Sequence, residues 1–175
     1  MASESFTLET VDGELDVPKT DLLSLEVELD NELASMFRLR LAIRQQRDGS
    51  WTYLDEERFL PWMPMRITGG FDNGAEELLS GYITHVKPDF PRNAAQCTLE
   101  IWGMDNSVLM DREERLYAWP NETDSTIAAT IFGRHGLSSE VTNTQTRHDD
   151  AISTIIQRET DMQFLKRLAL RNGFE

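Results

Sequence analysis

The chain has 175 residues, of which 39% are hydrophobic and 27% charged, and its formal net charge at pH 7 is -14. This composition is typical of a globular protein, and its acidic balance argues against a binder of nucleic-acid phosphates or of anionic membrane surfaces. The single cysteine, Cys97, excludes an internal disulfide, and no apolar run approaches the roughly 18 residues of a membrane span.

The beginning of the chain lacks the basic and apolar regions of an export signal, so we expect it to be made and assembled in the cytoplasm. The acidity is concentrated in residues 1–120, with a net charge of -12, against -2 for residues 121–175. This difference favours a chain of two parts.

The first part predicts a series of short strands. Residues 23–29 and 37–43 alternate apolar and polar side chains with period two, as strands with one buried face do. A turn at Asp48 and Gly49 precedes a further apolar run, the glycine-rich residues 69–74 fit a loop between strands, and Pro88 closes a strand. The remaining runs of this kind are residues 51–54, 65–68, 81–87 and 96–102. Their spacing favours an antiparallel barrel or sandwich.

After residue 103 the pattern changes to helical periods. Residues 106–112 fit one or two helical turns, and Thr123 is placed to cap a helix whose apolar face includes Ile127 and Ile131. Gly136 is placed to end that helix in a left-handed conformation.

The last segment carries a capping box, in which a threonine hydroxyl accepts from the backbone of the third helical residue. An aspartate in the first turn, an apolar stripe and a terminal glycine then define the whole helix. The residues of this motif are Thr160, Asp161, Gln163, Phe164, Leu165, Leu168 and Gly173.

Catalytic and metal-binding patterns are not found in the sequence. The three histidines, His85, His135 and His148, lack metal-ligand spacing, and a solvated polar loop explains residues 148–150 better than a metal corner does. The paired acids are adjacent in sequence, which on a strand sends their side chains to opposite faces. We therefore expect no catalytic residue, no metal and no cofactor.

Four segments together resemble a known family. Residues 6–15, 23–27 and 37–41 are similar to the opening of phage late control gene D proteins. Residues 157–173 are similar to a helix motif shared by that family and by the VgrG-like spike proteins of type VI secretion.

The resemblance implies a mainly β fold with inserted helices. It implies an antiparallel β-barrel hub domain at residues 1–118, followed at residues 119–175 by the helical and strand part of a second, incomplete barrel. An apolar residue directly after a helix-ending glycine, as Phe174 is after Gly173, normally begins another element. We therefore expect either that the chain is the N-terminal piece of a longer protein or that its second domain is incomplete.

In function, the resemblance implies a non-enzymatic baseplate hub of a phage tail or contractile injection particle. Such a subunit forms a homotrimer that connects the sixfold tail tube to the threefold spike, and it contacts tube, spike and other baseplate proteins. Under this interpretation Trp51, Trp62 and Trp119 are exposed interface anchors.

Two alternatives stay open at this point. The first is a separate β-rich module that binds carbohydrate or peptide through its tryptophans. The second is a hydrolase that uses a pair of carboxylates, which would have to converge across a cleft.

Overall fold

The computed structural model describes residues 4–30, 33–71 and 74–174. The chain divides into two compact units, Met1–Val108 and Leu109–Glu175. Strand β8 (Glu114–Trp119) pairs with β9 (Ile155–Thr160), so both strands belong to the second unit.

The first unit is built on a seven-stranded antiparallel sheet in the order β2-β1-β5-β6-β7-β4-β3. Two short 3-10 helices, η1 (Glu57–Phe59) and η2 (Ala94–Gln96), lie in its connections. The strands are β1 (Glu4–Thr10), β2 (Gly13–Glu14), β3 (Leu22–Glu28), β4 (Met36–Ala42), β5 (Pro64–Phe71), β6 (Gly74–Asp89) and β7 (Thr98–Asp105).

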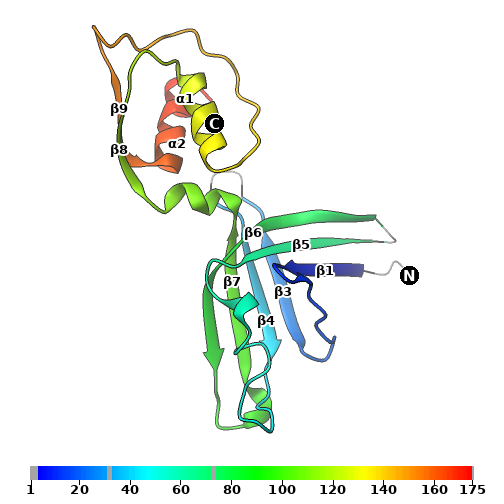
Figure 1. The fold of residues 1–175 in the computed structure, drawn as a ribbon. Helices are drawn as coiled ribbons and strands as arrows, with labels where there is room; N and C mark the ends of the chain where they lie inside the picture. The colour runs from blue at the N-terminus through cyan, green and yellow to red at the C-terminus, as the bar shows by residue number, and fades with distance from the viewer. Residues whose placement is uncertain (1–3, 31–32, 72–73, 175) are drawn as a thin grey trace. The chain divides into compact units, whose positions relative to one another are not determined.

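The long strand β6 belongs to both halves of this sheet. Its first half pairs with β5 up to Tyr82, and its second half pairs with β7 from Gly81 onward. Irregular register in β6 and β5 lets the strands turn, so that β1 and β5 run across the direction of β3, β4 and β7 (Figure 1). Gly81 lies at this corner, where a Cβ would overlap the backbone of Met104. The sheet therefore curls into a half-barrel.

The core of the first unit lies on the concave side of the sheet. On β4 the alternation predicted from the sequence is confirmed, because Phe37, Leu39 and Leu41 are buried while the residues between them are partly exposed. Gly103 on β7 makes room for the Phe37 ring, which a Cβ would overlap.

The prediction of a loop at residues 69–74 is wrong for most of them, because β5 runs to Phe71 and β6 begins at Gly74.

One predicted strand is also wrong. Residues 51–54 form a turn with one isolated bridge, because Tyr53 takes a positive φ of 64° and its hydroxyl donates to the buried Asp21 at 2.9 Å. Pro88 lies opposite Leu99, and β6 ends one residue later at Asp89, next to the predicted strand end. Only β7 among the described strands pairs with that part of β6, so a residue without an N–H is tolerated on the other edge.

The second unit places two helices against a two-stranded sheet. The 3-10 helix η3 (Asn106–Asp111) leads into β8, and α1 (Asp124–Arg134) and α2 (Asp161–Arg171) pack beside the β8–β9 pair. Residues 137–154 return along the other side of α1 (Figure 1). The core of this unit consists of Met110, Trp119, Ile127, Ile131, Ile155, Phe164 and Leu168.

The fold class predicted from the sequence is confirmed at the level of a mainly β chain with a few helices. The two long predicted helices are also found. Each begins after its predicted threonine cap, and each ends before a glycine with positive φ, 68° at Gly136 and 74° at Gly173.

Candidate functional site

The second unit contains a buried carboxylate, Asp161, whose side chain is 1% exposed. Asp161 is the first residue of α2, and Gln157 on β9 donates to its Oδ1 at 2.7 Å. The guanidinium of Arg134 contacts both carboxylate oxygens at 3.1 Å. His135 Nε2 lies 2.8 Å from Oδ2, and Arg115 Nε lies 3.3 Å from the same oxygen.

A second buried carboxylate, Asp124, is the first residue of α1, and its side chain is 4% exposed. His148 Nε2 lies 2.7 Å from its Oδ1, and Asn172 donates to its Oδ2 at 2.7 Å. Arg171 reaches the same carboxylate at 3.0 Å. Both aspartates are thus held by an arginine, a histidine and a side-chain amide.

The two sites connect the helices reciprocally. Arg134 and His135 at the end of α1 bind Asp161 at the start of α2. Arg171 and Asn172 at the end of α2 bind Asp124 at the start of α1. The two helices are therefore antiparallel, and each supplies cations near its own C-terminus to the other helix's acidic N-terminus.

These contacts change the ionisation of both carboxylates. Burial opposes the charged form of Asp161, but hydrogen bonds from Gln157 and His135 and the charge of Arg134 outweigh it, so the pKa of Asp161 is below its ordinary value. Burial likewise opposes ionisation of Asp124, and its polar partners again lower the pKa of that carboxyl. Both side chains are anionic at neutral pH and act as fixed charges rather than as proton donors.

The reciprocal arrangement has a signal in the sequence that local periodicity does not detect. The two helices match position by position at a spacing of 37 residues, from threonine cap to terminal glycine. The matched pairs are Thr123 and Thr160, Asp124 and Asp161, Ile127 and Phe164, Ile131 and Leu168, Arg134 and Arg171, His135 and Asn172, and Gly136 and Gly173. A comparison of the chain with itself at this spacing detects the matched positions from the amino-acid sequence alone.

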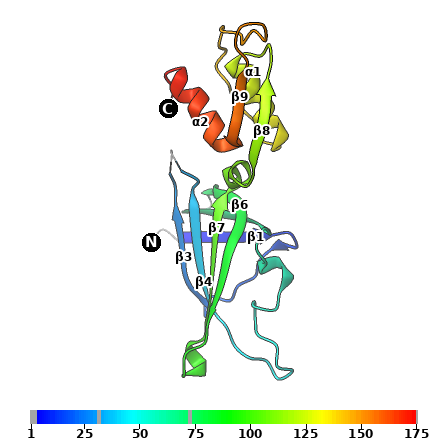
Figure 2. The ribbon, with the colours of Figure 1, turned by 90° about the vertical axis from the view of Figure 1, so that its left-hand side faces the viewer.

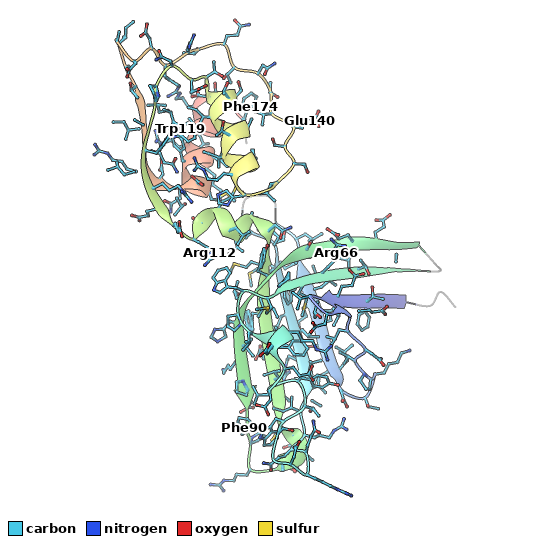
Figure 3. The ribbon with its side chains drawn as sticks, in the orientation of Figure 1. Arg66, Phe90, Arg112, Trp119, Glu140 and Phe174 are labelled. Carbon is cyan, nitrogen blue, oxygen red and sulfur yellow. The ribbon has the colours of Figure 1, made fainter. Side chains whose placement is uncertain are left out.

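A half-open cavity of about 290 Å³ lies beside Asp161. Its polar wall comes from Arg112, Arg115, Arg134 and His135, and its apolar wall includes Leu109 and Met110. Figure 3 labels Arg112, which follows η3 directly along the chain. Two acids, Glu113 and Asp161, complete the polar lining.

The guanidinium groups around this cavity are of a kind that binds anions. Within the described part of the chain, no group of three or more histidine, cysteine or acidic side chains is placed to hold a metal ion. Cys97, the one thiol, is buried in the other unit. Guanidinium groups bind carboxylates and phosphates through paired hydrogen bonds, which is the chemistry that this cavity offers.

The structure places the residues of the predicted capping motif as follows. The Thr160 hydroxyl accepts from the backbone of Gln163 at 3.2 Å, and Asp161, Phe164 and Leu168 are buried. Leu165 is partly buried against the same core, and Gly173 follows the C-cap.

The three tryptophans expected at an interface lie in different surroundings. Trp62 is 40% exposed and Trp51 is half-buried, with its ring edge against Phe90. Trp119, labelled in Figure 3, is 4% exposed. Its ring stacks on Phe164, and its indole N–H donates to Gln157 at 3.3 Å. Within this chain Trp119 is therefore a core residue and not an exposed anchor.

The expectation of a solvated loop at residues 148–150 is wrong for His148. This side chain is buried against Asp124, whereas Asp149 and Asp150 are exposed as expected. His135 also binds a buried aspartate, and His85 is exposed on β6. Local sequence could not reveal the partners of His135 and His148, because each aspartate lies 24 or more residues away.

Comparison with known proteins adds a family and a fold. The family described as the Alg8 N-terminal domain matches residues 5–174. No significant match was found among curated proteins. None of the helices in the described part of the chain is long and apolar enough to cross a bilayer.

Two solved structures share the fold. The 43 kDa tail protein of prophage MuSo2 from Shewanella oneidensis has a TM-score of 0.64 at 17% identity, covering 98% of this chain and 49% of that protein. A tail protein from Neisseria meningitidis MC58 has a TM-score of 0.61 at 13% identity, covering 95% of this chain and 46% of that one. The chain thus spans about half the length of these tail proteins.

Proposed function

The chain belongs to the Alg8 N-terminal domain family, and from its fold we propose that it is a structural subunit of a phage tail or contractile injection particle. The observation that carries the proposal is the fold match to two tail proteins over 98% and 95% of the chain. The two matches come from different bacteria and extend through both units of the chain.

Within such a particle, we propose the role of a baseplate hub of the late control gene D and VgrG-like type. Three copies form a ring that joins the sixfold tail tube to the threefold spike, and other baseplate proteins surround it. The ring is assembled in the cytoplasm. Its work is assembly, because association buries apolar surface and fixes the symmetry, and no chemical turnover is needed.

Exposed sheet edges and exposed leucine side chains support the proposal that the chain assembles with other subunits. Strand β3 forms one edge of the seven-stranded sheet (Figure 2), with Leu23 and the following Leu29 exposed by 48% and 66%. The β8–β9 sheet has only two strands among the described residues, and Leu116 on it is 79% exposed. Proteins usually cover or charge such edges, and a neighbouring subunit is one way to cover them.

The experiment that tests the proposal is a measurement of mass in solution by sedimentation equilibrium, followed by imaging of intact particles. We expect a trimer, and we expect a threefold density of this fold between tube and spike. A protein that stays monomeric over the accessible concentrations and is missing from purified particles would contradict the proposal. A monomer that binds glycans would instead favour the carbohydrate-binding module.

A further inference from the structure

We propose that the free edge of β3 is a docking site for an extended strand of a different protein, in which apolar side chains alternate with basic ones. The inference rests on the proposed function only for the source of that strand, another component of the particle. Three features of β3 carry it: its pairing in the sheet, the uncovered apolar residues on its inner face and the acids on its outer face.

Strand β3 has a partner on one side only. It pairs with β4 and stands last in the order of the sheet, so no strand among the described residues lies along its other edge (Figure 2). The register with β4 is regular over residues 24–28. An edge strand leaves backbone N–H and C=O groups available on its free side, and an extended segment can bind there by strand addition.

The hydrophobic core is uncovered at this edge. On β4, Phe37 and Leu39 are 1% and 0% exposed. Their partners on β3, Val27 and Leu25, pack against the same core but are only partly buried. Because β3 has no further strand beside it, its inner face stays open to solvent. Apolar side chains of an added strand can cover Val27 and Leu25 and extend the core by one strand.

The outer face of β3 carries acids. Glu26 and Glu28 alternate with the apolar residues and are exposed. Arg38 lies 3.9 Å from Glu26, but it also binds Glu100 on β7 and so divides its charge between two acids. Opposite charges on neighbouring strands attract and like charges repel. A strand that places basic side chains beside Glu26 and Glu28 therefore places its apolar side chains over the core.

The same acids disfavour a second copy of this chain as the occupant. Two β3 edges brought together place Glu26 and Glu28 of one copy beside the same acids of the other. A second free edge of this sheet is the first half of β6, which among the described strands pairs with β5 alone up to Ser80. That edge carries the exposed residues Glu76 and Glu77, so its pairing with β3 also brings acids together.

The remaining edge strands lack the required alternation. Residues 4–14, which include β1 and β2, contain no basic residue. On β8 the face with Leu116 also carries the acid Glu114, and on β9 the face with Arg158 also carries Ile156. A strand that matches β3 has basic side chains on one face and apolar ones on the other. We therefore assign this edge to a protein other than the chain itself.

The first experiment measures binding of synthetic peptides to the full chain by fluorescence anisotropy. The probe is a labelled peptide in which valine alternates with lysine, and its control has the same composition with the valines and lysines in two blocks. We expect the alternating peptide to bind about tenfold more tightly, because only it places every lysine on one face. An alternating peptide with N-methylated amides keeps the side chains and loses the donors, so we expect it not to bind.

The second experiment reverses the charge of the edge. Glu28→Lys alone, and together with Glu26→Lys, should weaken binding of the lysine peptide about tenfold and favour an alternating valine–glutamate peptide instead. Asp89→Lys changes the net charge as Glu28→Lys does, but at an exposed position at the end of β6, and should leave binding unchanged. Circular dichroism and thermal melting check folding, and the single variant suffices if the double variant does not fold.

The outcomes separate this inference from the proposed function. Equal binding of the alternating and block peptides, or an equal loss in Asp89→Lys and Glu28→Lys, would overturn the docking site and leave the hub proposal standing. Self-association that the lysine peptide displaces would assign the edge to a second copy and overturn the inference in the same way. Absence of the chain from purified particles would contradict the proposed function, while peptide binding at β3 would still support the docking site.

Discussion

The carboxylate of Asp161 is the most heavily contacted charge in the second unit. Asp161→Asn keeps the size of the side chain but removes the negative charge that Arg115 and Arg134 contact. Since breaking a buried ion pair leaves uncompensated charge, we expect the free energy of unfolding to fall by about 3–5 kcal/mol. Urea denaturation measures this change, and Glu140→Gln, at an exposed position, serves as the control with no expected change.

The lowered pKa values of Asp124 and Asp161 predict a pH dependence with a definite sign. A carboxyl whose pKa is lower in the folded state stabilises the fold fully above its unfolded pKa of about 4. That contribution is lost as the pH falls below about 4 and through the lower folded pKa, because the proton then binds in both states.

Urea midpoints between pH 7 and pH 2.5 test this expectation. The unmodified protein should lose stability in the second unit as the pH falls through this range. The double variant Asp124→Asn and Asp161→Asn should be less stable at pH 7 and should lose less on acidification. Equal pH profiles for the two proteins would show that these carboxyls are not responsible.

Gly103 and Gly133 form a matched pair of positions for the same substitution. Gly103→Ala places a methyl group into the space of the Phe37 ring, so we expect a loss of about 1–3 kcal/mol in unfolding free energy. Gly133→Ala adds a methyl group in α1 with no neighbour within 4 Å, and we expect a gain of about 0.5–1 kcal/mol. Thermal denaturation of both variants checks the two signs; a loss at Gly133 would contradict the open surroundings found there.

At the scale of elements, the helix caps contribute less to the free energy of unfolding than the buried side chains of the same helices do. Thr160→Ala removes the hydroxyl that accepts from Gln163, and we expect a cost of about 1 kcal/mol. Phe164→Ala empties a fully buried position of the same helix, and we expect a cost of about 3–5 kcal/mol. Chemical denaturation should resolve these two values.

The equivalent cap on α1 provides the control. Thr123→Ala should cost about as much as Thr160→Ala, because Thr123 accepts from Thr126 at the same 3.2 Å. Negligible effects at both caps and at Phe164 would mean that the helix pair contributes little to stability.

Element boundaries could be predicted from the sequence wherever local chemistry determines them. The threonine caps and the terminal glycines act within one helical turn, and the strand at β4 follows from its alternation. The turn at residues 51–54 could not be predicted from local sequence, because the position of Tyr53 depends on its hydrogen bond to Asp21, 32 residues away.

The candidate site was the least predictable part of the chain, because its contacts also join residues that are far apart in the sequence. The capping motif includes Asp161, but the sequence interpreted alone does not connect it with Arg134 or His135 across the fold. Trp119 was expected on the protein surface, because tryptophan is frequent at subunit interfaces. It lies in the core of the second unit instead, where Phe164 supplies a ring for stacking and Gln157 a hydrogen-bond acceptor.

At the scale of the whole molecule, the described residues form two hydrophobic clusters that share no residue. Each compact unit contains one of them. We therefore expect two unfolding transitions, because each core can be lost separately. Leu39→Ala should lower only the first-unit transition and Phe164→Ala only the second, as followed by hydrogen exchange of β4 and α2. A single transition shifted equally by both variants would contradict this independence.

The reciprocal pairing of α1 with α2 limits how these helices can be exchanged between relatives. If one helix alone is replaced by the helix of a relative, its aspartate must pair with the basic C-terminus of the unchanged helix, and its own basic C-terminus must pair with the unchanged aspartate. A relative with different residues at these positions would break both ion pairs. Recombination that replaces both helices together keeps the ion pairs, whereas a crossover between residues 134 and 161 separates them. The ion pairs are therefore kept only when both helices are replaced together.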